Sequence, residues 1–591
     1  MEKWFIAAKR ADFQRIADTF GITPVTARLI RNRDIVGEEA IREYLYGTTA
    51  DLHDPHLMKD MDRAADIICE KIAQSKRIRI VGDYDIDGVC ATYILFKGLK
   101  QLGACCDFYI PDRMKDGYGI NAAIIERARE DGIDTIVTCD NGISAIGEIA
   151  SAREAGMTVI VTDHHDIPYE EGPDGERCYK KSAANAVVNP KQADCAYPFK
   201  LLCGAAVAYR LVQVLYEKSG MPDAFREAEK EFLPFAAIAT VGDIMDLKGE
   251  NRILVKQGLK ALADTENPGL RALMDVCGVN PGQISAYQIG FVIGPCINAS
   301  GRLDTARRSL KLLLCEDDVS ARKLAMDLKE LNDERKDMTA RGTQEAIRLI
   351  GEMELLKDSV LVVPLYGCHE SLAGIIAGRI REKYNRPVFV LTRGEAGIKG
   401  SGRSIEGYSM YEELTKCSRY LEKFGGHPMA AGLSMREGQV EAFRKSLNAG
   451  SSLTEEDFIP KVTIDVAMPL EYISERQIRE LSLLEPFGKG NEKPMFAQKD
   501  LRVLHARILG KNRNVLKLLV ESPAGGVQME ALYFGDIPCF DAYIRERFGA
   551  DETEKMYLGR KNAVTLSVVY YPDVNEYRGV KTMQIVIKNY Q

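Results

Sequence analysis

The sequence lacks the features that would place the protein in a membrane or in an oxidising compartment. No apolar run approaches the ~18 residues that a membrane-spanning helix needs, and the first ten residues, MEKWFIAAKR, contain no apolar signal-peptide core. Fourteen cysteines are present, but no two are spaced as Cys-x-x-Cys, so the spacing indicates neither a zinc site nor a redox motif. We therefore expect a cytoplasmic protein with reduced cysteines and no membrane partner.

The chain has no excess of positive charge, and Trp4 is its single tryptophan. The formal charge of −7 argues against a broadly basic nucleic-acid binder. One basic groove is still compatible with this charge, because a metal site would use several of the carboxylates. The length of 591 residues, with 46% hydrophobic and 28% charged residues, is typical of an ordinary globular protein of about three to four domains.

An alternation of strand-like and helix-like runs begins at residue 77. The strand-like runs are 77–82, 106–110, 135–139, 158–162 and 186–189. The helix-like runs between them are 89–102, 122–130 and 145–155. This order predicts a doubly wound, mostly parallel sheet, and the polar stretch 169–185 predicts an exposed loop.

Later parts of the chain predict a connector, a second α/β unit and a β-rich module. Residues 319–357 contain no proline and are rich in helix-forming residues, which predicts one or two long helices. The second unit begins with strand 359–363 and ends in Gly-rich turns and helices near 449. Short β-like runs dominate from Lys461, with the helix-like stretch 473–484 as the exception, and an all-β barrel such as an OB-fold fits them.

Three carboxylates follow the first strand-like run at alternate positions. Asp83, Asp85 and Asp87 lie in GDYDIDG, directly after RIRIV. Alternate residues of an extended chain point the same way, so the three could share one space. Negative charges at such short distances need a cation between them, and carboxylate oxygens suit Mg²⁺ or Mn²⁺. A solvated turn is the alternative, less favoured because the run ends a buried-looking strand.

Further acidic and imidazole residues end other segments. Asp140 follows the run 135–139, Asp163-His164-His165 follow 158–162, and Asp243 follows an apolar helical run. The carboxyl ends of parallel strands meet at one edge of a sheet, where α/β proteins bind ligands. Carboxylate and imidazole ligands without thiolate favour Mn²⁺ or Mg²⁺, and this many carboxylates favours two ions.

These residues resemble the four motifs of the DHH phosphoesterase superfamily: GDYDIDG at 82–88, TCDNG at 138–142, DHH at 163–165 and VGD at 241–243. A wider match is to the bacterial exonucleases specific for single strands. Its motifs are NASGRLD (298–304), HESLAGIIAGR (369–379), GSGRS (400–404), GGHPMAAG (425–432) and EPFGKGN (485–491). Cys368 stands where this family usually has tryptophan.

The resemblance implies a fold with two α/β domains, DHH and DHHA1, joined by a long helix, plus a C-terminal all-β OB-fold. The expected parts are an N-terminal helical and connecting segment 1–76, a DHH catalytic domain 77–318, a connector helix 319–357, a DHHA1 domain 358–450 and a nucleic-acid-binding OB-fold 461–591.

The implied activity is 5′-to-3′ degradation of single-stranded DNA to 5′-mononucleotides, in repair and recombination, with two Mn²⁺ or Mg²⁺ ions. Single-strand-binding protein and a helicase are the candidate protein partners. The alternative is a DHH-family phosphodiesterase for short oligoribonucleotides or cyclic dinucleotides. The C-terminal module favours the exonuclease, because a short substrate gains little from an extra strand-binding domain. A catalytically silent nucleic-acid binder is disfavoured by the intact set of Asp and His.

The resemblance also implies roles for the metal-centre residues. The implied ligands are Asp85 with Asp83 for one ion, Asp87, His164 and Asp243 for the other, and Asp140 as the bridge. His165 would lie beside the scissile phosphate and Asp163 would orient a histidine; with Asp140 they are the expected catalytic residues.

The remaining motifs supply groups suited to phosphate binding. The expected substrate-binding residues are Arg302, His369, Arg379, Ser401, Arg403, Gly425, Gly426 and His427. Arginine holds phosphates through paired donors. The Gly-Gly-His segment offers exposed backbone amides and an imidazole, with a plain tight turn as the alternative. Tyr118 could stack a base, with packing within its own turn as the alternative.

Overall fold

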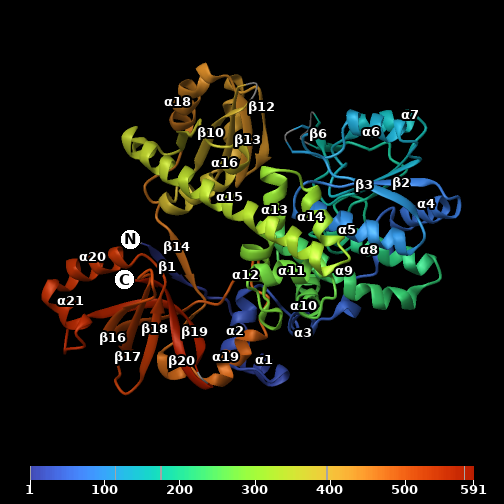
Figure 1. The fold of residues 1–591 in the computed structure, drawn as a ribbon. Coiled ribbons are helices and arrows are strands. Elements are labelled where there is room, and N and C mark those ends of the chain that lie inside the picture. The colour runs from blue at the N-terminus through green and yellow to red at the C-terminus, as the bar shows by residue number, and fades with distance from the viewer. Residues whose placement is uncertain (1, 114, 173–175, 395–396, 578) are drawn as a thin grey trace. The chain divides into compact units, whose positions relative to one another are not determined.

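The computed structural model describes residues 2–113, 115–172, 176–394, 397–577 and 579–591 (Figure 1). The chain forms two compact units. One unit is Leu52–Pro460, and the other combines Glu2–Asp51 with Lys461–Gln591. None of the described helices is both long and apolar enough to cross a membrane.

The first unit contains a five-stranded parallel sheet in the order β3-β2-β4-β5-β8. Its strands are β2 (Arg77–Val81), β3 (Cys105–Tyr109), β4 (Thr135–Cys139), β5 (Thr158–Thr162) and β8 (Ala186–Val188). The expected doubly wound sheet is confirmed. A short antiparallel pair, β6 (Tyr169–Glu171) with β7 (Arg177–Tyr179), lies where a loop was expected.

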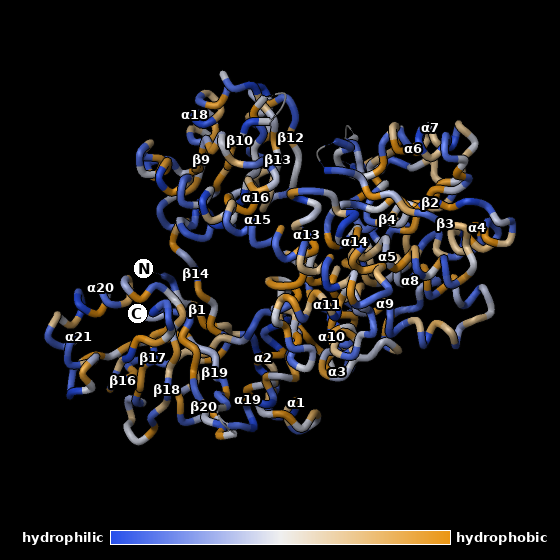
Figure 2. Tube along the Cα trace, in the orientation of Figure 1, coloured by the Kyte–Doolittle hydropathy of each residue, from blue (hydrophilic) through white to orange (hydrophobic). Residues whose placement is uncertain are grey.

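Helices cover both faces of this sheet because alternate strand residues point to opposite sides. Ile80 and Val137 pack with α5 (Ile86–Gln101) and α8 (Gly204–Lys218) on one face. Val81 and Ile136 pack with α6 (Ala122–Glu130) and α7 (Ile146–Glu154) on the other. Hydrophobic residues concentrate around α5 and α8 (Figure 2). This double burial explains why the strands read as continuous apolar runs.

A helical region follows the sheet and leads to the connector. Its helices are α9 (Pro222–Gly242), α10 (Gly249–Ala263), α11 (Pro268–Val276), α12 (Ala286–Gln288), α13 (Gly294–Leu303) and α14 (Arg307–Leu313). A π-helical turn, η4 (Ile289–Ile293), links α12 to α13. The connector is the single helix α15 (Asp318–Glu352).

The second α/β part has a mixed sheet in the order β12-β13-β11-β10-β9, with α16 (Glu370–Tyr384) packed on it. The strands are β9 (Leu361–Pro364), β10 (Val388–Gly394), β11 (Gly397–Arg403), β12 (Lys423–His427) and β13 (Ala430–Met435). The expectation of Gly-rich turns here is wrong, because the glycines lie in strands. A Cβ at Gly402 would be 2.6 Å from Phe389 Cε1, so glycine makes room for a large neighbouring side chain.

The C-terminal strands close into a barrel, since β16 (Phe496–Leu509) pairs with both β17 (Val515–Glu521) and β19 (Thr565–Tyr577). The other barrel strands are β18 (Gln528–Tyr533) and β20 (Val580–Tyr590). The expected OB-fold is confirmed. The helix expected at 473–484 is present as α19 (Glu475–Ser482). The rest of the module is nevertheless not all-β as expected, because α20 (Ile537–Phe548) and α21 (Ala550–Tyr557) lie between β18 and β19.

The N-terminal segment belongs mostly to this second unit. Strand β1 (Lys3–Ile6) pairs in parallel with β14 (Lys461–Ile464). Helices α1 (Phe13–Phe20), α2 (Pro24–Asn32) and α3 (Glu38–Tyr46) share its apolar core. The segment 1–76 is therefore divided: residues up to Asp51 join the barrel unit, and α4 (Met61–Ala73) joins the core of the sheet β3-β2-β4-β5-β8.

A buried carboxylate on α19 joins these distant segments. Glu480 Oε2 accepts hydrogen bonds from Thr23 N (2.7 Å), Thr23 Oγ1 (2.7 Å) and Thr26 Oγ1 (2.8 Å). Burial opposes ionisation of Glu480, yet the hydrogen bonds from Thr23 and Thr26 hold its pKa below the usual value.

We expect Glu480→Ala to lower the free energy of unfolding of the second unit by about 3 kcal/mol, because three donors lose a charged acceptor. Trp4, in β1, reports this unit during denaturant unfolding. With a lowered folded-state pKa, the contribution is present above the unfolded pKa of ~4.3 and is lost as pH falls below it. The exposed Glu475→Ala control should change stability by less than about 0.5 kcal/mol; an equal loss in both variants would contradict the assignment.

Candidate metal centre

The acidic residues lie where the strand order of the parallel sheet reverses. Asp83 follows β2, Asp140 follows β4 and Asp163 follows β5, while Asp243 ends α9. The chain passes from β2 to β3 on one side and then returns to β4 on the other. This is the position at which open α/β sheets bind ligands.

Asp83, Asp85 and Asp87 gather for a different reason than the alternation suggested. Helix α5 begins at Ile86, three residues before the expected start, and Asp85 is its N-cap. Asp85 Oδ1 accepts hydrogen bonds from the Asp87 and Gly88 amides, both at 3.0 Å. The expectation of an extended segment is therefore wrong, since an N-cap aspartate turns the chain into the helix. Asp87 therefore lies in the first turn of α5 and not in an extended segment.

A second helix N-terminus holds the Asp87 carboxylate. The amides of Gly204 and Ala205, at the start of α8, donate to Asp87 Oδ2 (2.6 Å) and Oδ1 (2.7 Å). A Cβ at Gly204 would lie 2.6 Å from Asp140 Cβ, so only glycine fits. Asp140 itself has φ 60°, a left-handed conformation that Asp and Asn adopt more readily than other non-glycine residues.

Potential ligand atoms form three overlapping groups among the described residues, each within 4.8 Å. The groups are Asp83 with Asp85 and Asp140, Asp87 with His164 and Asp243, and Asp140 with His164 and His165. His164 Nε2 lies 3.1 Å from Asp140 Oδ1, 3.5 Å from Asp87 Oδ2 and 3.7 Å from Asp243 Oδ2. Asp140 therefore lies beside Asp83 and Asp85 on one side and beside His164 on the other. His164 in turn belongs to the group that contains Asp87 and Asp243.

The burial and charge of these residues fit divalent cations. Asp83 Oδ1, Asp140 Oδ1 and His164 Nδ1 are buried and make no hydrogen bond with any described residue, a costly state for polar atoms. Burial, followed by the charge of Asp85, raises the pKa of Asp83 well above its usual value. Burial, then the charges of Asp87, Asp85 and Asp83, does the same to the pKa of Asp140. A cation would relieve this repulsion.

The donor set contains oxygen and nitrogen but no thiolate. Cys90, Cys139 and Cys203 lie close by, and burial raises the pKa of each thiol, that of Cys139 to about 12. These thiols stay protonated and are poor ligands. Carboxylate and imidazole donors suit Mn²⁺ or Mg²⁺ better than a structural zinc ion.

His165 and Asp163 form a hydrogen-bonded pair at the edge of the centre. Asp163 Oδ1 accepts from His165 Nδ1 (2.8 Å) and from the His164 and His165 amides (2.7 and 3.0 Å). Burial disfavours a charged His165, but the hydrogen bond and charge of Asp163 raise its pKa to about 9. The His165 side chain is 44% exposed. Asp163 therefore orients a protonated imidazole that solvent can reach.

Neighbouring polar residues that the sequence reading missed hold this edge of the sheet. Asn141 donates to Val81 O (3.0 Å) and Cys139 O (2.9 Å), tying the ends of β2 and β4. Asn189 donates to His165 O (2.9 Å). The only sequence signal was their position at the ends of strand-like runs: Asn141 comes two residues after the run 135–139, and Asn189 is the last residue of the run 186–189.

Tyr118 is anchored by its hydroxyl group, which donates to Asp140 O (3.0 Å) and lies 3.3 Å from the His165 ring nitrogens. These contacts with Asp140 and His165 fix the position of Tyr118, so base stacking is not needed to explain it.

Three of the expected phosphate-binding side chains meet at the start of α16. Arg302, on α13, donates from Nη1 to Ser371 O (2.9 Å). His369 is the N-cap of α16 and accepts from the Ser371 amide. Arg403 lies beside Gly374, where an added Cβ would be 2.9 Å from Arg403 Nη2. Burial lowers the pKa of both arginines, that of Arg302 to about 10, so each guanidinium lacks full hydration and suits an anion.

The other expected phosphate-binding residues are more dispersed. Arg379 is exposed near the end of α16, and Ser401 lies in β11. Gly425, Gly426 and His427 are exposed in β12, so the alternative of a tight turn is wrong. Gly426 has φ 145°, and a Cβ there would lie 2.4 Å from Ala430 O. Glycine at this position therefore allows β12 and β13 to pair closely.

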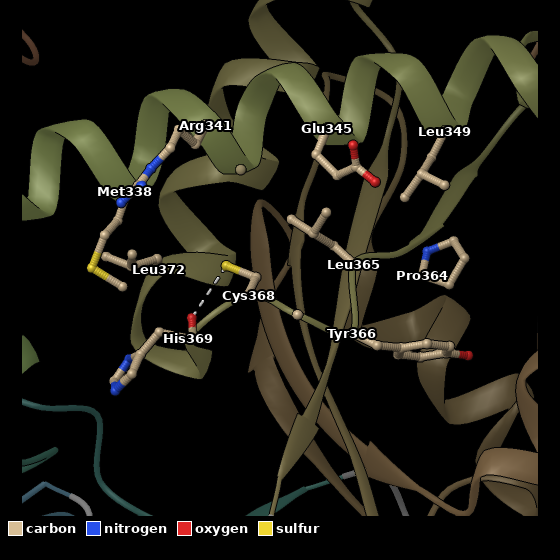
Figure 3. Close-up of a pocket in the computed structure, with 12 residues that line it drawn as sticks. Met338, Arg341, Glu345, Leu349, Pro364, Leu365, Tyr366, Cys368, His369 and Leu372 are labelled. Carbon is tan, nitrogen blue, oxygen red and sulfur yellow. Dashed lines mark hydrogen bonds between the residues drawn. The ribbon is translucent and has the colours of Figure 1, made fainter.

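His369 also lines a cavity of about 410 Å³ between α15 and residues 364–372 (Figure 3). Met338 and Arg341 project from α15 on one side, and Leu372 lies beside Met338. Cys368 contributes to the same wall. Burial raises the pKa of the Cys368 thiol to about 11, so it lines the cavity as a neutral group.

Three family models match successive parts of the chain. The DHH family N-terminal domain matches residues 77–240, the DHHA1 domain 357–450 and the RecJ OB domain 464–589.

Individual relatives match over the whole length. The chain is 35% identical over 592 residues to the single-stranded-DNA-specific exonuclease RecJ of Bacillus subtilis, covering 99% of this chain and 70% of that protein. RecJ from Thermus thermophilus in complex with Mn²⁺ has a TM-score of 0.80 at 27% identity, covering 100% of this chain and 79% of that one. The complex of the same Thermus thermophilus protein with Mg²⁺ has a TM-score of 0.75 at 26% identity, covering 100% of this chain and 78% of that one.

We expect Asp140→Asn to raise the melting temperature in EDTA and to reduce the further rise that Mn²⁺ causes. A carboxyl group with a raised pKa destabilises the folded protein at neutral pH, and asparagine removes that charge while tolerating the left-handed backbone. A ligand at about 100 times its Kd stabilises by about 2.7 kcal/mol, most of which the variant should lose. Scanning calorimetry with EDTA or Mn²⁺ measures both effects.

The control is Asp166→Asn, which removes an exposed carboxylate paired with Lys191. It should leave the Mn²⁺-induced rise unchanged. A full Mn²⁺ response in Asp140→Asn would contradict the placement of Asp140 at the centre of the metal site.

Proposed function

The chain belongs to the RecJ family of single-stranded-DNA-specific exonucleases, and we propose that it degrades a DNA strand from its 5′ end and releases 5′-mononucleotides. The protein is an exonuclease for single-stranded DNA that uses Mn²⁺ or Mg²⁺. The observation that carries the proposal is that buried Asp140 lies between two groups of potential ligands, Asp83 with Asp85 and Asp87 with His164 and Asp243. Such an arrangement suits two metal ions that share one carboxylate.

In the proposed site, Asp83 and Asp85 would hold one ion, Asp87, His164 and Asp243 would hold the other, and Asp140 would be shared by both. Two ions, when bound, activate a water molecule and stabilise charge on the phosphoryl group. Asp163 keeps His165 oriented and protonated. The protonated imidazole can then donate a hydrogen bond to a phosphate oxygen as its negative charge increases.

Substrate contacts are proposed for the groups around α16 and on the neighbouring strands. Arg302 and Arg403 are cations with incomplete hydration, which favours phosphate binding. Ser401, Gly425, Gly426 and His427 offer further donors, and His369 and Arg379 lie at the start and near the end of α16. Because Arg302 also donates to Ser371 O, it joins the metal-centre helix α13 to this binding region.

The setting is proposed to be DNA repair and recombination in the cytoplasm, with single-strand-binding protein and a helicase as partners. The described cysteines are all free, which suits a reducing compartment. The alternative phosphodiesterase for oligoribonucleotides or cyclic dinucleotides does not account for the RecJ OB domain at residues 464–589.

End-labelled strands test the direction and the product. With Mn²⁺, a 5′-labelled single strand should release labelled mononucleotide at once, whereas a 3′-labelled strand should shorten gradually. RNA and blunt duplex DNA of the same sequence should be degraded far more slowly. A ladder of shortened fragments from the 5′-labelled DNA would reverse the proposed polarity.

We expect His165→Ala to lower kcat by about 10²- to 10⁴-fold, the usual effect of removing a group that acts on the transition state. The Mn²⁺-induced rise in melting temperature should persist, because the proposed metal ligands remain. His56→Ala, which removes an imidazole paired with Asp62 and Glu217, is the matched control and should not alter kcat. Loss of the Mn²⁺ response in His165→Ala would place His165 among the metal ligands instead.

A further inference from the structure

Two aromatic side chains stack on each other in solvent beside the metal-centre scaffold. Tyr287 and Phe291 are 64% and 67% exposed, with ring centroids 4.9 Å apart and ring planes 30° apart. They lie four residues apart on the run α12–η4–α13 (Figure 1), a spacing that places side chains on one face. The π-helical turn that carries Phe291 is rare and is found mostly at functional sites.

The same helical run contacts the residue between two proposed ligands. Asn298 Oδ1 accepts a hydrogen bond from the Ile86 amide (2.9 Å), and a Cβ at Gly294 would be 3.2 Å from Ile86 Cδ1. Ile86 separates Asp85 from Asp87. Gly294 is three residues after Phe291, about 5 Å along a helix. The aromatic pair therefore lies roughly one helical turn from the residues that pack on the metal centre.

The pair is also supported from the Asp243 side. A Cβ at Gly290 would be 3.6 Å from Val241 Cγ1, and Val241 is two residues before Asp243. The next residue, Ile244, is 66% exposed and has φ 56°. A β-branched residue in this conformation is strained, and such strain concentrates at functional sites. Apolar surface is thus presented to solvent on both elements that flank the centre.

We propose that Tyr287 and Phe291 form a stacking platform for the unpaired bases of the substrate strand as it approaches the metal centre. This inference rests on the proposed function. An aromatic platform accepts every base, because each has a flat π-face, and an exonuclease must accept every sequence. In a duplex those faces are already stacked on neighbouring bases, so the platform favours single strands over duplex DNA.

Binding to a 5′-phosphorylated oligothymidine of about 20 nucleotides tests the platform, with affinity measured by fluorescence anisotropy in an Asp140→Asn background that prevents cleavage. Phe291→Ala should raise Kd by about 5- to 100-fold, as expected for one stacked base. Phe291→Trp should retain affinity, while Phe291→Leu, which keeps apolar bulk without a ring, should not. Val319→Ala, at another highly exposed apolar residue, should bind as tightly as the parent.

A strand with its bases removed separates stacking from other contacts. The parent protein should bind it about as weakly as Phe291→Ala binds oligothymidine, and Phe291→Ala should weaken that binding no further. In a Trp4→Phe background, the fluorescence of Phe291→Trp should be quenched by the oligothymidine and not by the abasic strand.

Unchanged Kd in Phe291→Ala, or full affinity in Phe291→Leu, would overturn the platform and leave the pair as a surface for another protein. Those results would not affect the proposed function, because the unsubstituted enzyme would still degrade end-labelled single strands. Failure of the unsubstituted enzyme to degrade them would instead overturn the function itself.

Discussion

Mutual repulsion among carboxylates around Asp140 is the constraint on which the site depends. Asp83, Asp87 and Asp140 are almost fully buried, and their side chains share a small space with Asp85 and Asp243. Groups of like charge in low dielectric separate or become neutral unless something holds them. Here the fold holds them with backbone amides: the α5 N-terminus binds Asp85 and the α8 N-terminus binds Asp87. The protein thus stores unfavourable electrostatics that two divalent ions would relieve.

The surrounding elements link this centre to the region proposed to bind the strand. The run α12–η4–α13 carries the aromatic pair at one end, contacts Ile86 in the middle and ends near Arg302. Arg302 then donates to Ser371 on α16. The residues proposed for base stacking, metal binding and phosphate binding therefore share one helical scaffold. A strand held at one end of this scaffold would be positioned relative to the chemistry at the other.

The fold and most metal-centre residues could be predicted from the sequence because their signals are local. A parallel sheet buried on both faces gives apolar runs, and a polar residue directly after such a run marks its carboxyl end. Asp140, Asp163 and His164 were found in this way. The alternation of Asp83, Asp85 and Asp87 predicted that these residues converge, but by the wrong geometry, since the capping ability of Asp85 prevails over an extended conformation. Whether each residue has its expected catalytic role stays a prediction.

Features that depend on distant partners could not be predicted. Gly204 is needed only because Asp140 packs against it, and the glycines of β11 are needed only because large side chains lie beside them. The pairing of β1 with β14 joins residues more than 450 positions apart, and no local pattern specifies such a partner.

Electron paramagnetic resonance of the Mn²⁺-loaded protein tests the shared carboxylate most directly. Two Mn²⁺ ions that share Asp140 would lie about 3.5–4 Å apart, so titration should end at two ions per chain with a spin-coupled spectrum. Asp140→Asn should lose that coupling. A single ion per chain, or two ions with the uncoupled six-line signal of isolated Mn²⁺, would contradict a centre built around one shared carboxylate.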